Sequence, residues 1–271
     1  VVGAFTVNLA DVGSYVFTVA NAAATAITFA GDGLTGVNAL LVDASAFTHT
    51  LTLTSGDGDD QITVGSGTTN LTLGDGNNTV TVADSALNNA LSITGGTGTD
   101  VLLISDSAAI SNSDLNNISG IDTIRLGANS ASMIIVNTYV NATDDGDTLI
   151  IDNQGFTLSS LRTSQLSGGN GVTITGTGQV TLSNHDNNTI TIADGVNGDI
   201  MGGTQRDIIY GGTGNDVVNS RNDHDSVLGG DGDDDLFGDR NNDTLDGGSG
   251  NDTLNGGREH DILLLETVLM L

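Results

Sequence analysis

The chain of 271 residues carries a formal net charge of −28 at pH 7, with 34 acidic residues against six basic ones. This charge argues against binding to nucleic acid or to anionic lipid surfaces, both of which attract cationic proteins. Aromatic residues make up only 3% and cysteine is absent, so we expect a thin core without disulfide bonds. No apolar run is long enough to span a bilayer as a helix.

The amino-terminal part, residues 1–103, contains short segments in which threonine or serine lies between two apolar residues. In a β-strand such a segment turns both apolar side chains to one face and the hydroxyl side chain to the other. Gly, Asn and Asp fill the gaps between the segments and favour a turn at each corner. We therefore expect a β-solenoid with strands near 5–7, 17–19, 27–29, 51–53, 62–64, 71–73, 80–82 and 91–93.

Within this part, residues 55–103 contain partial nine-residue units that begin at Ser55, Val64, Leu73 and Gly95. If residues 83–94 form one widened edge of a coil, the turns from Ser55, Leu73 and Gly95 stack on one side. Residues 104–183 are less regular and are expected to continue the solenoid.

Seven consecutive nine-residue units fill residues 202–264, within a carboxyl-terminal part that we place at 184–264. Every unit has aspartate at its sixth position and an aliphatic residue at its eighth. The sixth-position residues are Asp207, Asp216, Asp225, Asp234, Asp243, Asp252 and Asp261. Two units make a coil of about eighteen residues, so alternate turns stack on the same edge and adjacent coils lie about 4.8 Å apart. Carboxylates at that spacing repel by roughly 1 kcal/mol in water and by more at lower dielectric.

The pattern Gly-Gly-x-Gly-x-Asp-x-aliphatic-x resembles the repeats-in-toxin (RTX) nonapeptide, whose family fold is a parallel β-roll that binds calcium. Carboxylate and carbonyl oxygens are the ligands that calcium prefers, and the ion removes the repulsion between stacked aspartates. The fold class that we predict is all-β: an elongated parallel β-solenoid that ends in an RTX-type calcium β-roll, with Ca²⁺ as its cofactor.

The resemblance implies which residues hold calcium, because the ion takes positions two, four and six of one turn and positions one, three and six of the next. Three units match the pattern at every glycine position, and their turns share one edge of the roll. The implied ligands there are Gly212, Gly214, Asp216, Gly229, Asp231 and Asp234 for one site, and Gly230, Gly232, Asp234, Gly247, Ser249 and Asp252 for the next.

The same assignment extends to the partial units of residues 55–103. It implies the candidate ligands Gly56, Gly58, Asp60, Gly74, Asp75, Gly76, Asn78, Gly95, Thr97 and Asp100. The alternative is that these Gly, Asn and Asp residues simply form stable turns.

The opposite edge of the roll departs from the pattern, since its four units lack glycine at position four and each carries one arginine. The arginines are Arg206, Arg221, Arg240 and Arg258. We predict that their guanidinium groups pair with Asp207, Asp225, Asp243 and Asp261 in place of calcium, because arginine matches a carboxylate in a fork geometry. The alternative is weak calcium sites beside solvated arginines.

The apolar tail, residues 265–271, resembles the carboxyl-terminal signal of secreted RTX proteins, and it is equally suited to cover the open end of the roll. We expect a secreted, non-catalytic calcium-binding structural protein of a cell-surface layer, filament or matrix, resembling bacterial surface-layer proteins. Its partners would be further copies of itself and cell-surface polysaccharide. A fragment of an RTX adhesin and the secretion module of an RTX enzyme are the alternatives. An ice-binding solenoid fits less well, because the threonine spacing is irregular.

Overall fold

The structure is a computed structural model. It describes residues 4–9, 13–19, 25–31, 34–35, 38–83, 86–87, 90–106, 115, 117–127, 149–152, 158–161, 172–176, 179–182 and 188–265. The described strands fall in two compact units, one containing the strands up to residue 126 and the other those from residue 149. Within the described residues, no helix has the length and apolar character needed to cross a membrane.

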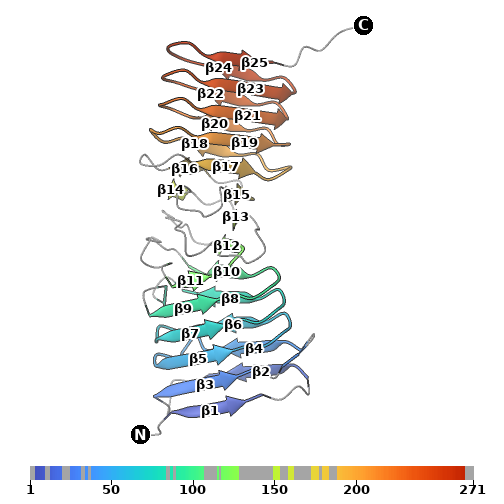
Figure 1. Cartoon of the computed structure of the whole chain (residues 1–271), viewed down its shortest axis with the longest axis vertical. Helices are drawn as coiled ribbons and strands as arrows, with labels where there is room; N and C mark the ends of the chain where they lie inside the picture. The colour runs from blue at the N-terminus through green and yellow to red at the C-terminus, as the bar shows by residue number, and fades with distance from the viewer. Residues whose placement is uncertain are drawn as a thin grey trace. The chain divides into compact units, whose positions relative to one another are not determined.

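The first unit contains two rows of parallel strands, and the chain passes from one row to the other and back (Figure 1). One row is β1 (Phe5–Asn8), β3 (Ala26–Ala30), β5 (Thr50–Thr54), β7 (Thr69–Thr72), β9 (Leu91–Thr94) and β11 (Ile118–Ser119). The other is β2 (Tyr15–Thr18), β4 (Leu40–Asp43), β6 (Gln61–Thr63), β8 (Thr79–Val82), β10 (Val101–Ile104) and β12 (Thr123–Leu126). This alternating path is that of a β-solenoid.

Alternation along each strand builds the core of the first unit. In β5, Leu51 and Leu53 are buried while Thr52 between them is half-exposed. The parallel register places Leu53 beside Leu71 of β7, so apolar side chains stack from coil to coil. Burial of each such side chain is worth about 1.5–3 kcal/mol.

Most of the expected strands of the first unit are confirmed to within one or two residues. β4 and β10 were not among the expected strands, because their sequences Leu-Leu-Val-Asp and Val-Leu-Leu-Ile lack the central hydroxyl residue. The expected boundary between residues 103 and 104 falls inside β10, which pairs in parallel with β12. Most of the expected segment 104–183 lies outside the described residues.

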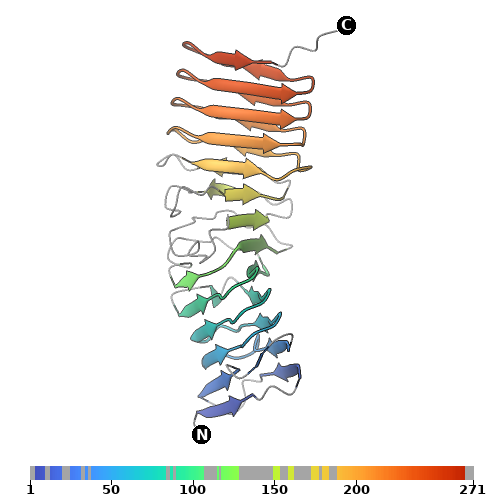
Figure 2. The ribbon, with the colours of Figure 1, turned by 45° about the vertical axis from the view of Figure 1, so that its right-hand side comes forward.

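The second unit repeats the plan. One row contains β13 (Leu149–Asp152), β15 (Val172–Ile174), β17 (Thr189–Ile192), β19 (Ile208–Gly212), β21 (Ser226–Asp231), β23 (Thr244–Ser249) and β25 (Ile262–Leu264). The other contains β14 (Leu158–Leu161), β16 (Val180–Leu182), β18 (Asp199–Met201), β20 (Val217–Asn219), β22 (Asp235–Phe237) and β24 (Thr253–Asn255). The strands from β17 to β25 stack as successive coils (Figure 2).

The register of these coils confirms the eighteen-residue repeat. Val227 pairs with Ile209 of the coil before it and with Leu245 of the coil after it. All three are eighth-position residues, and all three are buried. The eighth-position residues from Ile209 to Leu245 are all buried, as the sequence predicts, and the turns between strands fall on two opposite edges.

Candidate calcium-binding turns

The turns of residues 202–264 form two stacks. We call the stack of turns that begin at Gly211, Gly229 and Gly247 the motif edge, because all three match the glycine pattern. The turns that begin at Gly202, Ser220, Gly238 and Gly256 form the variant edge. The predicted division of the seven units between two edges is therefore confirmed.

One carboxylate oxygen of each sixth-position aspartate has a structural role. On the motif edge, the backbone N–H of Asp216 donates to Oδ1 of Asp234 over 2.8 Å, and the N–H of Asp234 donates to Oδ1 of Asp252 over 3.0 Å. On the variant edge the same bond joins Asp207 to Asp225, Asp225 to Asp243 and Asp243 to Asp261, at 2.7, 2.8 and 3.0 Å. Each aspartate therefore caps an otherwise orphaned amide of the turn before it.

The second carboxylate oxygen of four of these aspartates is buried without a hydrogen bond, whereas Oδ2 of Asp207 accepts from the N–H of Gly203 over 2.9 Å. On the motif edge the buried oxygens without a hydrogen bond are Oδ2 of Asp216 and Asp234. Burial raises the pKa of Asp216 to about 7 and also raises the pKa of Asp234. A buried, unpaired carboxylate oxygen is costly, so each of these atoms requires a cation or a proton.

Backbone carbonyl groups point into the same gaps between turns. A Cβ atom at Gly248 would overlap the carbonyl oxygen of Gly230 in the turn before it, and a Cβ at Gly250 would overlap that of Gly232. Both glycines also have positive φ, of +80° and +147°. Glycine is required here because only a residue without a side chain lets carbonyl oxygens approach so closely.

The oxygens of the next turn face the same gap. The carbonyl oxygen of Ser249, at position three, accepts a hydrogen bond of 2.8 Å from the N–H of Gly232. The carbonyl oxygen of Gly247, at position one, lies against Gly229. Backbone oxygens from positions one to four of both turns therefore lie near the same gap, and the assignment of calcium to positions two, four and six of one turn and one, three and six of the next stays a prediction.

The donor set fits calcium. Hard carbonyl and carboxylate oxygens converge on each gap, and the carboxylate contributes an unsatisfied charge. Among the described residues, no group of three or more His, Cys, Asp or Glu side chains gathers to hold a metal. The set therefore depends on backbone carbonyls, which a search for clustered acidic side chains does not detect.

Comparison with protein families agrees with this geometry. The model of the RTX calcium-binding nonapeptide repeat matches residues 193–227 and 228–263. Residues 193–263 are RTX calcium-binding nonapeptide repeats. A search of curated proteins and a search of solved structures found no match.

The RTX repeats begin one unit earlier than the sequence pattern indicates. Residues 193–201 form an eighth unit, with Ile200 buried at position eight and Gly198 at position six. The N–H of Gly198 donates to Oδ1 of Asp216 over 2.6 Å, so this turn joins the motif edge. Sequence reasoning missed it because glycine replaces the aspartate. The sequence signal for this turn is asparagine at position five, which Asn197 shares with Asn215. In the structure the N–H of Asn215 donates to Oδ1 of Asn197 over 3.0 Å.

The predicted arginine–aspartate pairs of the variant edge are wrong. Within residues 202–264, all of which the structure describes, no ion pair joins Arg206, Arg221, Arg240 or Arg258 to Asp207, Asp225, Asp243 or Asp261. Instead, Oδ2 of Asp225 and Asp243 is buried without a hydrogen bond, as on the motif edge. Burial raises the pKa of Asp225 to about 7 and that of Asp243 to about 6. The reason is placement: the arginines occupy positions two, three and five, whose side chains lead away from the inward carboxylates.

The variant edge differs in its backbone. Five non-glycine residues have positive φ, and all lie at position two or four of its turns: Arg221, Asp223, Asp239, Asn241 and Glu259. Such a conformation costs roughly 1–2 kcal/mol per residue. Side chains at position four compensate by capping the turn before, since Asn241 accepts from the N–H of Asp223 at 3.3 Å and Glu259 from that of Asn241 at 2.9 Å.

The partial units of the first unit stack as predicted. Thr79 pairs with Gln61 and with Val101, so the turns from Ser55, Leu73 and Gly95 lie on one edge. The position-six ladder continues there: the N–H of Asp60 donates to Oδ1 of Asn78 over 3.0 Å, and that of Asn78 donates to Oδ1 of Asp100 over 3.1 Å. The carbonyl oxygens of the candidate ligands Gly56, Gly58, Gly74 and Gly76 face the next turn, as on the motif edge.

Asn78 fills one of the two predicted calcium sites with its own amide group. Its Nδ2 donates to the carbonyl oxygens of Gly74 and Gly76 over 3.3 and 3.2 Å, and to Oδ1 of Asp100 over 2.8 Å. Asp100 Oδ2 is satisfied by the N–H of Gly96 at 3.1 Å. These hydrogen bonds already satisfy the oxygen atoms that calcium would bind, so this site does not fit the ion. Its predicted ligands are Gly74, Gly76, Asn78, Gly95, Thr97 and Asp100.

The other predicted site of this edge still fits. Oδ2 of Asp60 is buried without a hydrogen bond, and burial raises the pKa of Asp60 to about 6. Sequence reasoning also missed Asp122, which extends the ladder because its Oδ2 accepts from the N–H of Asp100 at 2.5 Å. The pattern Gly120-x-Asp122-x-Ile124 is the signal that identifies this fourth turn.

Proposed function

We propose that this protein is an extracellular, non-catalytic structural component of a cell-surface layer, filament or matrix, whose coils fold and associate when calcium is bound. Support comes first from the RTX turns. Their buried carboxylates oppose folding where calcium is scarce and favour it where calcium is abundant. Extracellular calcium modules bind at about 10⁻⁴–10⁻³ M, so such turns suit a protein that is folded outside the cell.

The observation that carries the structural role is the last coil of the described chain. Leu263 is at position eight and has 45% of its surface exposed, although its partner Leu245 in the coil before has none. Its neighbours Ile262 and Leu264 are also exposed. Exposed apolar side chains at core positions are a surface through which solenoids associate.

Association is tested by sedimentation velocity in calcium and in chelator, using the whole chain. We expect calcium-dependent oligomers that are lost in Leu263→Gln and kept in Leu228→Gln. Leu228 is the matched control because it is 39% exposed but lies on the outer face within the stack. A monomer at every calcium concentration would contradict the proposal and would favour an RTX module attached to another activity.

The tail, of which residues 266–271 lie outside the described residues, is tested by deletion. If the tail is part of the contact, the shortened protein assembles less. If assembly is unchanged after refolding in calcium, the tail is not needed for association and export becomes its better-supported role.

A further inference from the structure

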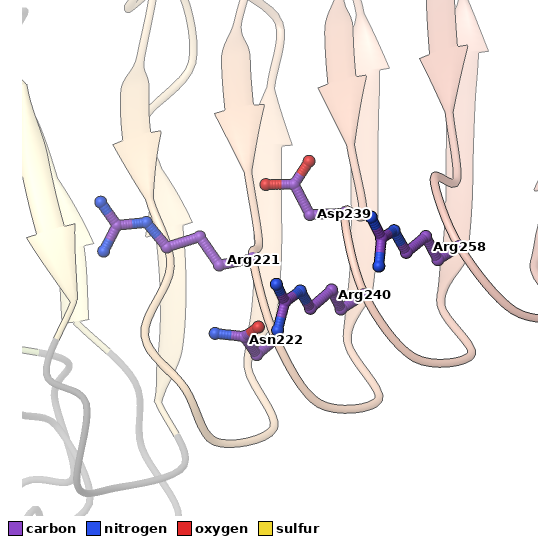
Figure 3. Close-up of a pocket in the computed structure, with 5 residues that line it drawn as sticks. All are labelled: Arg221, Asn222, Asp239, Arg240 and Arg258. Carbon is purple, nitrogen blue, oxygen red and sulfur yellow. The ribbon is translucent and has the colours of Figure 1, made fainter.

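A groove on the variant edge gathers three of the six basic residues of the chain. It has a volume of about 420 Å³ and is lined by Arg221, Asn222, Asp239, Arg240 and Arg258 (Figure 3). The three arginines come from three consecutive coils. Half of the cationic side chains of a protein with a net charge of −28 therefore line one groove.

The guanidinium groups in this groove outnumber its one carboxylate, that of Asp239, by three to one. Residues 202–264 are all described, and no arginine among them forms an ion pair with a carboxylate. Nearby carboxylates are engaged elsewhere, since Glu259 accepts from the N–H of Asn241 and Asp223 accepts from the N–H of His224 at 2.9 Å. Arg221 donates only to the Sδ atom of Met201, which is a weak acceptor.

The arrangement of the donors suits a row of oxyanions. Arg240 and Arg258 both occupy position three of their turns, so they are one coil apart, about 4.8 Å along the stack. In Figure 3 the three arginine side chains extend to the same side of their turns. Each guanidinium presents a fork of N–H donors that matches a carboxylate, sulfate or phosphate group.

Asp239 and Asn222 make the groove selective. An acidic side chain among three guanidiniums disfavours a simple anion, but it accepts hydrogen bonds from hydroxyl groups. The amide of Asn222 both donates and accepts. A ligand that carries anionic groups and free hydroxyls along one chain satisfies all five residues, and acidic sugars have that composition.

We propose that this groove binds an acidic polysaccharide, whose sulfate or carboxylate groups pair with Arg221, Arg240 and Arg258 and whose hydroxyls bond to Asp239 and Asn222. The inference names a partner class for the proposed surface protein, and binding itself requires only the folded RTX repeats. The negative charge of the rest of the chain confines a polyanion to this groove.

The test is isothermal titration calorimetry with a sulfated, heparin-type oligosaccharide in saturating calcium, on protein that carries Leu263→Gln in every variant so that it is expected to stay monomeric. Arg240→Gln and Arg258→Gln are expected to weaken binding about tenfold each, the loss typical of one charge-assisted contact. Arg206→Gln is the matched control, because it removes the same charge from the same edge outside the groove, and its affinity should equal that of the wild type. Circular dichroism in calcium verifies that each variant is folded.

Two further probes make the result decisive. An uncharged oligosaccharide of the same length should not bind, and inorganic sulfate should bind far more weakly than the sulfated oligosaccharide. If inorganic sulfate binds as tightly as the sulfated oligosaccharide, the groove is a simple anion site and the proposal is wrong. If Arg206→Gln loses as much affinity as Arg240→Gln and Arg258→Gln, binding is nonspecific electrostatic attraction, which also overturns the proposal. Because the protein is monomeric in this assay, failure here leaves the association test of the proposed function unaffected.

Discussion

The side-chain amide of Asn78 donates a hydrogen bond of 2.8 Å to Oδ1 of Asp100, across the gap between two stacked turns. The same Nδ2 atom also reaches two backbone carbonyl oxygens. Its Oδ1 atom meanwhile accepts from the N–H of Asp60, which fixes the orientation of the amide. In this gap a neutral amide group thus satisfies the carbonyl and carboxylate oxygens, whereas the corresponding oxygens of the RTX repeats require a cation.

Replacement of Asn78 by aspartate should convert this gap into a calcium site. Asn78→Asp removes the amide donors and adds a carboxylate beside Asp100, so without calcium the first unit should lose about 1–3 kcal/mol of stability. Added calcium should restore it, as measured by thermal unfolding. Asn77→Asp, an equal charge change at an exposed position, should show neither effect. If the melting temperature of Asn78→Asp does not change when calcium is added, the gap does not become a calcium site and the prediction is wrong.

Removal of calcium should unfold the RTX repeats selectively. Their uncompensated carboxylates repel once the ion is gone, whereas the coils around Asn78 and Asp100 retain their hydrogen bonds. Hydrogen exchange with mass spectrometry in EDTA should show lost protection in peptides from 202–264 and retained protection in peptides from 91–104. Unchanged protection of 202–264 would refute calcium-coupled folding.

The metal-free repeats should become less stable as pH rises. Burial raises the pKa of Asp216 and Asp225 to about 7 and that of Asp243 to about 6. Unfolded aspartate titrates near 3.9, so the folded state binds more protons than the unfolded state between about pH 4 and pH 7. In EDTA the folded fraction of the repeats, measured by circular dichroism, should therefore be higher near pH 5 than near pH 8. Saturating calcium should reverse the order, because the ionised carboxylates bind it.

Both edges of the RTX repeats should contribute to calcium binding. Asp234→Asn on the motif edge and Asp243→Asn on the variant edge each preserve the Oδ1 cap and remove the charge of Oδ2. Each should weaken calcium binding in calorimetry and raise the folded fraction in EDTA, since a buried unpaired charge is removed. An effect confined to Asp234→Asn would show that the variant edge does not bind the ion.

Close stacking of the glycine turns should be measurable by substitution. Gly248→Ala places a Cβ against the carbonyl oxygen of Gly230 at a φ of +80°, whereas Gly195→Ala has a φ of +74° and open space. The conformational cost common to both is about 1–2 kcal/mol. The loss of stability in Gly248→Ala should exceed this cost, and calcium binding should weaken. Gly195→Ala should lose only the conformational cost and should keep its calcium binding. Equal losses by chemical denaturation would show that carbonyl stacking is unimportant.

Periodicity was sufficient to predict the coils, because one aliphatic side chain per nine residues determines which positions face the core. It also located the sixth-position aspartates and their division between two edges. It could not locate the turn at Gly198, where the carboxylate is absent, or the turn at Asp122, where glycine is present only at position four.

Two chemical details lay beyond the sequence. In the sequence, asparagine at position six suggests a weaker calcium ligand than aspartate. Only the structure shows that the side-chain amide of Asn78 donates hydrogen bonds to the oxygen atoms of the gap. One arginine in each unit of the variant edge suggested that guanidinium groups neutralise the aspartates there. The direction of a side chain depends on its position in the turn and on a left-handed backbone, as at Arg221, and neither follows from the charge of a unit.

The Oδ1 caps give the stack a direction. Asp216 relies on Asp234 for its amide bond, and Asp234 relies on Asp252, so every coil depends on the coil that follows it in the chain. Loss of a coil at the carboxyl end leaves buried amides without acceptors, while loss at the amino end merely returns a carboxylate to water. Unravelling from the two ends is therefore unequal in energy. We therefore expect the coils at the amino-terminal end of the RTX repeats to open before those at the carboxyl-terminal end.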